Sequence, residues 1–128
     1  MPGGTWPLLL RDSLFLLGRR GGGGGRGRVA GLLCLGYPFH PPGQPEKLRT
    51  AHLEILATPT LICQGTRDSF GTREEVAGYG LSPSIDILWL EDGDHDLKPR
   101  KSISGLSAAD HLATIARATA EWIARITA

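Results

Sequence analysis

Cysteine, excess charge and long apolar runs are all scarce in this sequence. Among 128 residues there are two cysteines, Cys34 and Cys63, each in a short apolar segment, so we expect buried thiols rather than a disulfide or a zinc site. The formal net charge of +1 argues against attraction of the whole molecule to nucleic acid or to membranes. Charged residues interrupt the leucines at positions 8–10 and 14–17, so these runs can neither span a bilayer nor form a good signal peptide. A cytoplasmic location follows by default.

The residues that are present divide the chain into two parts. Hydrophobic residues make up 41% and charged residues 21%, which is typical of a globular domain with one modest core. Residues 18–28 are glycine and arginine alone. Glycine has no side chain to bury and loses the most backbone entropy on ordering, so this stretch is expected to be a mobile loop. We therefore assign residues 1–28 to an irregular, Gly/Arg-rich segment and residues 29–128 to the folded domain.

The glycine tract has two functional interpretations, and both are weak. It matches Gly-x-Gly-x-x-Gly, but any polyglycine does so, and no Lys-Ser/Thr pair completes a phosphate loop. Its arginines are typical of Arg-Gly segments that contact RNA, but no aromatic residue is interleaved to stack on bases. We therefore expect no cofactor and no nucleic-acid partner.

Apolar stretches bounded by turn residues predict strands at residues 14–17, 29–37, 60–65 and 85–90. Helices are expected between and after them. The longest of these is C-terminal, and its apolar residues repeat every three or four positions. This alternation predicts an α/β fold, with a parallel sheet of about four strands and a C-terminal amphipathic helix.

Three polar residues predict where the helices begin. Thr50 is a plausible N-cap for a short helix that precedes the strand at 60–65. Thr72 is followed by a glutamate three residues later, which is the pattern of a capping box. Ser107 with Asp110 opens the C-terminal helix in the same way.

Two further polar side chains follow neighbouring strands. Asp68 comes just after the strand at 60–65, and His95 comes after the strand at 85–90. In open parallel sheets, ligands and catalytic groups gather at the carboxyl ends of strands. Strand–Asp followed by strand–His is also the chain order of the acid and base in a Ser…Asp…His triad. We therefore predict that the Asp68 carboxylate and a His95 ring nitrogen lie roughly 2.6–3.2 Å apart.

Four segments carry a resemblance to a known family, at residues 34–43, 46–50, 64–68 and 92–95. They resemble the α/β-hydrolase superfamily, in the branch of dienelactone-hydrolase-like proteins and of the hydrolase-like domain of testis-expressed and NSL-complex subunit proteins. The resemblance covers the C-terminal half of that fold. It implies a three-layer domain, serine-type hydrolysis of an ester- or lactone-like bond in a small molecule, and the roles of acid for Asp68 and base for His95.

The nucleophile that this family requires is missing. In the family the serine lies in a strand–turn–helix elbow that reads Gly-Arg-Ser-Met-Gly-Gly-Arg or similar, and here residues 14–19 look like the strand and the first half of that elbow. Arg20 takes the place of the serine. None of the serines has glycine on both sides, as the tight elbow demands (serines 13, 69, 82, 84, 102, 104 and 107). We therefore predict a protein that does not hydrolyse esters; the alternative is a non-catalytic interaction or scaffold domain of the same fold.

Other interpretations of the polar residues are weaker. Asp92, Asp94 and Asp96 have the spacing that opens a calcium loop, but the glycine and the bidentate glutamate that such a loop needs are absent, so no metal site is expected. The remaining histidines, at positions 40, 52 and 111, are expected at the surface.

The short Gly/Arg connection limits how the strands on either side of it can pair. A parallel crossover needs a dozen or more residues and a helix, and the eleven residues 18–28 contain no helix. The strand at 14–17 should therefore pair with residues 29–37 weakly or in an unusual way. One face of the strand at 29–37 should lack helix cover, and such an exposed edge would favour self-association.

Overall fold

A four-stranded sheet forms the middle of the molecule, and the computed structural model describes residues 14–19 and 28–128. Arg20, the position expected to replace the nucleophile, lies outside the described residues, as does most of the Gly/Arg stretch. The elements in chain order are β1 (Leu14–Arg19), β2 (Arg28–Leu35), α2 (Ala51–Glu54), β3 (Thr60–Gly65), α3 (Arg73–Val76), β4 (Ile85–Leu90), α4 (Lys101–Ser104) and α5 (Ala108–Ile126).

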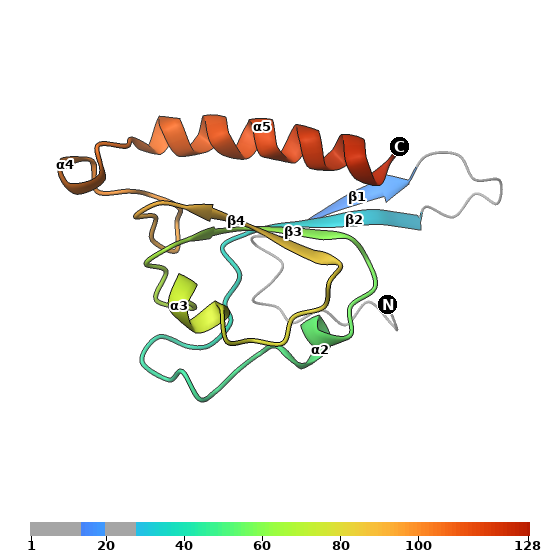
Figure 1. Cartoon of the computed structure of the whole chain (residues 1–128), viewed down its shortest axis with the longest axis horizontal. Coiled ribbons are helices and arrows are strands. Elements are labelled where there is room, and N and C mark those ends of the chain that lie inside the picture. Colours follow the sequence, from blue (N-terminus) through green and yellow to red (C-terminus); the bar gives the residue numbers. More distant parts are fainter. Residues whose placement is uncertain (1–13, 20–27) are drawn as a thin grey trace.

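The strands lie in the order β1-β2-β3-β4 (Figure 1). β2, β3 and β4 are parallel, as the alternation of strands and helices predicts. β1 is antiparallel to β2, so three strands of the sheet are parallel, and the expectation that the strand at 14–17 pairs with residues 29–37 in an unusual way is confirmed. The physical reason is the short connection, because a strand that turns back directly can only pair antiparallel. β1 also shows that residues 1–28 are not irregular throughout, since regular structure begins by Leu14.

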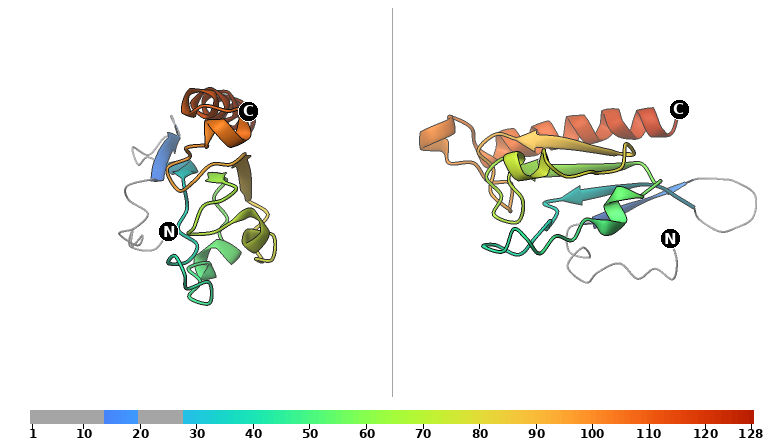
Figure 2. Two further views of the ribbon diagram at one scale, coloured as in Figure 1. Left: turned by 90° about the vertical axis from the view of Figure 1, so that its left-hand side faces the viewer. Right: turned by 60° about the horizontal axis from the view of Figure 1, so that its bottom comes forward.

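One face of the sheet is covered by α5, which runs along it in all views (Figures 1 and 2). Trp122, Ile115 and Leu97 pack there against Leu61 and Cys63 of the central strand. Cys34 of β2 and Cys63 of β3 are both buried, and they form no disulfide with each other. The central strand β3 is buried along its whole length, as expected for a strand between two covered faces.

β2 has helix cover as well, contrary to expectation. A Cβ atom added at Gly31 would lie 2.7 Å from Ile126 Cδ1 and 2.8 Å from Trp122 Cη2, so the C-terminal turns of α5 press directly on this strand. Further along β2, Leu33 and Leu35 are half-buried and pack on the same core. Glycine is needed at position 31 because any side chain would meet the helix.

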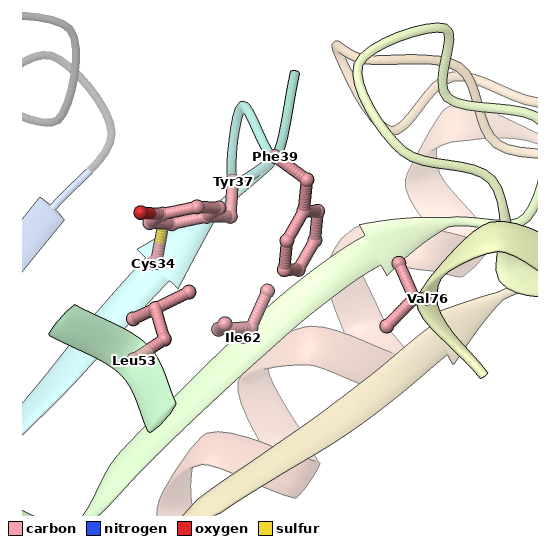
Figure 3. Packing of buried hydrophobic residues seen from close by; sticks show 6 residues of the cluster. All are labelled: Cys34, Tyr37, Phe39, Leu53, Ile62 and Val76. Atoms are coloured by element: carbon pink, nitrogen blue, oxygen red, sulfur yellow. The ribbon is translucent and has the colours of Figure 1, made fainter. Parts of the chain in front are cut away.

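The opposite face is covered by α2, α3 and the loops that join them to the strands (Figure 1). Figure 3 shows the core on this side, where Tyr37, Phe39 and Leu53 pack over the strands. The ring centroids of Tyr37 and Phe39 are 4.7 Å apart, in a tilted arrangement. With α5 on the other face, the fold has three layers, as the resemblance implies.

All three predicted capping residues stand at the starts of helices, and two of them make capping hydrogen bonds. Thr72 and Ser107 each accept a hydrogen bond from the third helical residue, and the partner carboxylate bonds back to the cap, so both capping boxes are complete. Thr50 is the N-cap residue of α2, but its side chain makes no capping bond. Within the described residues, no helix is both long and apolar enough to cross a membrane.

We predict that Gly31→Ala destabilises the protein by about 1–3 kcal/mol, because the new methyl group overlaps the Trp122 ring and the end of Ile126. Urea unfolding measures the change. Gly80→Ala is the matched control, since a Cβ at Gly80 meets nothing within 4 Å, and it should leave stability unchanged or slightly raised. Equal effects of both substitutions would contradict the close packing of α5 on β2.

Candidate active site

Asp68 lies in the turn that follows β3, and its side chain is completely buried. One carboxylate oxygen, Oδ1, accepts a hydrogen bond of 2.8 Å from the backbone N–H of Phe70. The other, Oδ2, lies 2.9 Å from His95 Nδ1. A buried carboxylate is costly unless it is paired and hydrogen-bonded, and here both oxygens have a donor.

His95 follows β4 and brings its ring against Asp68, at the distance that the sequence predicts. The carboxylate accepts a hydrogen bond from Nδ1, so Nδ1 carries the proton, and Nε2 is the ring nitrogen that does not contact Asp68. The ring of Phe70 lies beside the imidazole, with centroids 4.2 Å apart and an interplanar angle of 34°. The side chain of His95 remains 36% exposed.

The charge around His95 favours its protonated form. The hydrogen bond that His95 donates to Asp68 raises the pKa of His95; burial opposes this, and the negative charges of Asp68, Asp96 and Asp94 add to the increase. The pair is therefore an imidazolium–carboxylate pair over a wider pH range than a free histidine would allow.

The two loops meet because two glycines lie in close contact. A Cβ atom at Gly65 would lie 2.1 Å from the carbonyl oxygen of Gly93, a distance that no real side chain can occupy. A third glycine, Gly36 at the end of β2, has φ +81° and faces the carbonyl of His95 in the same way. The Asp68 and His95 loops can approach only where these side chains are absent.

Hydrogen bonds and ion pairs made by Asp92 hold the loop that carries His95. The carboxylate of Asp92 accepts hydrogen bonds from the backbone and the guanidinium of Arg100, which together hold the pKa of Asp92 at about 2. Arg67 donates through Nε to the carbonyl of Asp92 at 2.8 Å, and so ties this loop to the one that carries Asp68. The carboxylate of Asp94 accepts from the backbone of its own loop. These carboxylates therefore serve the loop structure.

Gln64 supports the Asp68 loop, and its role was not evident from the sequence. It is completely buried at the end of β3. Its side-chain amide exchanges hydrogen bonds with the backbone of Tyr37, at 2.8 and 3.2 Å, and donates to the carbonyl of Gly71 at 3.1 Å. A polar residue inside an apolar strand was the available signal, because a buried amide must find partners.

The other histidines are not surface residues, contrary to expectation. His40 and His111 are buried and His52 is half-buried. Both ring nitrogens of His40 face acceptors, the Pro41 carbonyl at 2.8 Å and the Glu75 carboxylate at 2.9 Å, so both carry hydrogen. Burial lowers the pKa of His40, but these hydrogen bonds outweigh it and the pKa is raised. His111 donates from Nε2 to the carbonyl of Glu91 at 2.8 Å.

The described end of β1 lies far from this pair along the sheet. Arg19, at the end of β1, pairs with Arg28 at the start of β2, whereas Asp68 and His95 follow the ends of β3 and β4. The seven steps from Arg28 to the end of β2 correspond to roughly 20 Å at ~3.3 Å per residue. In residues 14–19 and 28–128, no serine hydroxyl hydrogen-bonds to His95.

We predict that Asp68→Asn lowers the pKa of His95, because the hydrogen bond and charge that raise it are removed. NMR titration of the imidazole between about pH 5 and about pH 9 measures this shift. Asp96→Asn is the control: this exposed side chain contributes only at longer range, so its effect on the pKa should be smaller.

Asp68→Asn should also change how the free energy of unfolding depends on pH. A raised histidine pKa stabilises the folded state below the unfolded value of about 6.5, and this contribution is lost as the pH rises through the folded value. The stability difference between the wild type and Asp68→Asn should therefore shrink from acidic to basic pH in urea unfolding. A difference that grows with pH would contradict the imidazolium–carboxylate pair.

Comparison with known proteins identifies the family of the domain. The family model described as an alpha/beta hydrolase domain matches residues 14–124, which is most of the chain. No solved structure matches the chain.

Proposed function

Because this chain belongs to the alpha/beta hydrolase domain family, we propose that it is a hydrolase-fold protein that keeps the acid and base of a serine hydrolase but performs no acyl transfer. The observation that carries the proposal is the Asp68–His95 hydrogen bond, together with the lack of a serine hydroxyl bonded to His95 among residues 14–19 and 28–128. We further propose that it derives from the dienelactone-hydrolase-like branch, and that the ancestral substrate was a small ester- or lactone-like molecule. The segments at 34–43 and 64–68 support this finer assignment through their resemblance.

The roles of the two residues follow from their hydrogen bonds. Asp68 holds the Nδ1–H of His95, so Nε2 is the basic atom when the ring is neutral. In the intact family mechanism, Nε2 takes the proton of the serine hydroxyl and later returns it to the leaving group. With no hydroxyl bonded to Nε2 in the described residues, the pair can only polarise a water molecule.

The Asp68–His95 pair alone is insufficient for acyl transfer. Acyl transfer needs a nucleophile beside the base and backbone N–H donors for the oxyanion. One of those donors normally comes from the residue after the nucleophile. Position 20 follows Arg19, whose partner Arg28 lies at the opposite end of β2 from the site. The described end of β1 therefore lies at the opposite end of the sheet from His95.

We predict that the purified chain neither hydrolyses an activated ester with burst kinetics nor reacts with a serine-directed phosphonate probe. Arg20→Ser should not restore either reaction, because the glycine and arginine residues that follow position 20 predict no helix to hold an elbow. The controls are His95→Ala in both backgrounds, which should leave the background rate unchanged. Hydrolysis that is lost in His95→Ala would show that a nucleophile stands beside the base, and the proposal would then be wrong.

The alternative function, an interaction or scaffold domain, is favoured by the edge of the sheet. Among the strands that the structure describes, β1 and β4 are the edges, so β2 is not the exposed strand that the sequence suggested. β4 contains neither proline nor lysine, and Asp86 is its one charged residue. Ile85, Ile87 and Trp89 are half-buried along a pocket of about 370 Å³. Edge strands of this kind tend to pair with other strands.

We predict that two copies of the chain associate weakly through antiparallel pairing of their β4 edges. Sedimentation equilibrium over a range of concentrations measures this. Ile87→Lys should suppress association, whereas Ala116→Lys on the exposed face of α5 should not. A monomer at every concentration would rule out the self-association part of the alternative.

A further inference from the structure

The loop of residues 38–44, which follows β2, holds the turn between β3 and α3 at three points, and we call this loop the clamp. The backbone N–H of His40 donates to the carbonyl of Phe70 at 3.0 Å. The ring of Phe39 fills the space at Gly71, where an added Cβ atom would lie 2.5 Å from Phe39 Cδ2. The third contact joins the ring of His40 to α3.

This third contact is an ion pair. His40 Nε2 lies 2.9 Å from Glu75 Oε1, and Nδ1 lies 2.8 Å from the carbonyl oxygen of Pro41. Because both partners are acceptors, both nitrogens donate and the ring carries a positive charge. A neutral imidazole has a single N–H, so it would leave its second nitrogen facing an oxygen lone pair. His40 is only 2% exposed, so little water can reach the ring to replace the lost bond.

Glu75 connects the clamp to the start of α3. The oxygen that accepts from His40, Oε1, also accepts from the backbone N–H of Thr72 at 3.0 Å and from the Thr72 hydroxyl at 3.2 Å. These bonds from Thr72 belong to the capping box of α3. The charge on the His40 ring therefore acts directly on the residues that begin this helix.

Two carboxylates face the ring of His40, and they come from the two elements packed against it. Glu75 belongs to α3, and Asp68 lies in the turn that follows β3. The clamp itself contains no other titratable side chain. Tyr79, near Glu75, keeps its proton because burial raises its pKa. Asp68 is shared with His95, so Glu75 is the carboxylate that bonds to His40 itself.

These charges define a range of pH in which the pair is complete. Burial lowers the pKa of His40, but its hydrogen bonds and the two carboxylates outweigh burial, so the pKa is raised above 6.5. The stabilisation by the imidazolium is therefore complete below pH 6.5 and is lost as the pH rises through the folded value. Hydrogen bonds from the Thr72 backbone and from His40 lower the pKa of Glu75, so its contribution is complete above pH 4.5 and is lost as the pH falls through the folded value.

We propose that the His40–Glu75 pair is a pH switch: the protonated ring holds the clamp against the Phe70 turn and α3, and loss of its proton in mildly basic solution releases both. Phe70 transmits the release to the Asp68–His95 pair, because its backbone N–H donates to Asp68 and its ring lies 4.2 Å from the ring of His95. The inference goes beyond the proposed function, since it needs no nucleophile and is tested without an ester. The two can therefore fail separately.

The test follows the His40 titration by NMR and amide hydrogen exchange in the same samples of the full chain, between about pH 5 and about pH 9. The reporters are the N–H groups of His40 and Glu75, which bond to the Phe70 carbonyl and the Thr72 hydroxyl. Their protection factors, which correct for the intrinsic effect of pH on exchange, should fall roughly tenfold as the imidazole loses its proton. The N–H of Ile62 in the buried strand β3 should keep its protection.

Two neighbouring glutamates of α3 provide matched variants. Glu75→Gln removes the charge, and glutamine can still complete the capping box, so the helix start is retained. This variant should move the His40 titration, and the loss of protection with it, to lower pH. Glu74→Gln is the control, because Glu74 is exposed and neither ring nitrogen of His40 bonds to it, and it should behave as the wild type.

A third variant removes the titrating group itself. His40→Gln cannot carry a charge, so the protection of the Glu75 N–H should no longer depend on pH. Three results would overturn the proposal. They are a His40 titration at or below pH 6.5 in the wild type, protection that does not follow this titration, and equal effects of the two glutamate variants.

Discussion

The contact between Gly65 and Gly93 is the constraint on which the site depends. Parallel strands bring their ends to one edge of the sheet, but adjacent strand ends do not by themselves place two side chains in contact. Here the turn after β3 and the turn after β4 press together with no side chain between them. The backbone N–H of Arg67 then donates to the Gly93 carbonyl at 3.1 Å, which joins the two turns. The carboxylate of Asp68 and the imidazole of His95 meet because their backbones have already met.

The site also shows how protein groups stabilise the buried carboxylate of Asp68. Asp68 is fully enclosed, and its two oxygens are satisfied by one backbone donor and one imidazole. Gln64 lies one residue before the turn and bonds to backbone groups on both sides, so the loop that carries the carboxylate cannot shift without breaking buried hydrogen bonds. Such networks specify one arrangement, since a half-satisfied version would cost more than an apolar core. This precision would benefit catalysis.

The sequence predicted the parts of this structure that depend on local chemistry. Strand ends followed by Asp68 and His95, and the capping boxes at Thr72 and Ser107, were visible because each involves residues close together in the chain. The direction of β1 was missed, because it depends on the length of a connection and on what competes for the edge of β2. The burial of His40 was missed because its partner Glu75 lies 35 positions away, and composition carries no information about such a pair.

The antiparallel pairing of β1 with β2 has a consequence for the order of folding. Leu14 and Cys34 are twenty positions apart (34 − 14), and the pairs closer to the turn are nearer still, so this contact closes a short loop. Hairpins of this kind form in about 1–10 μs, whereas parallel crossovers must close longer loops and fold more slowly. Among the described strands, β1 and β2 also leave the ribosome before β3 and β4. β2 therefore enters the folding of the parallel layer with one edge already occupied, and growth of the sheet proceeds in one direction only, from β2 through β3 to β4.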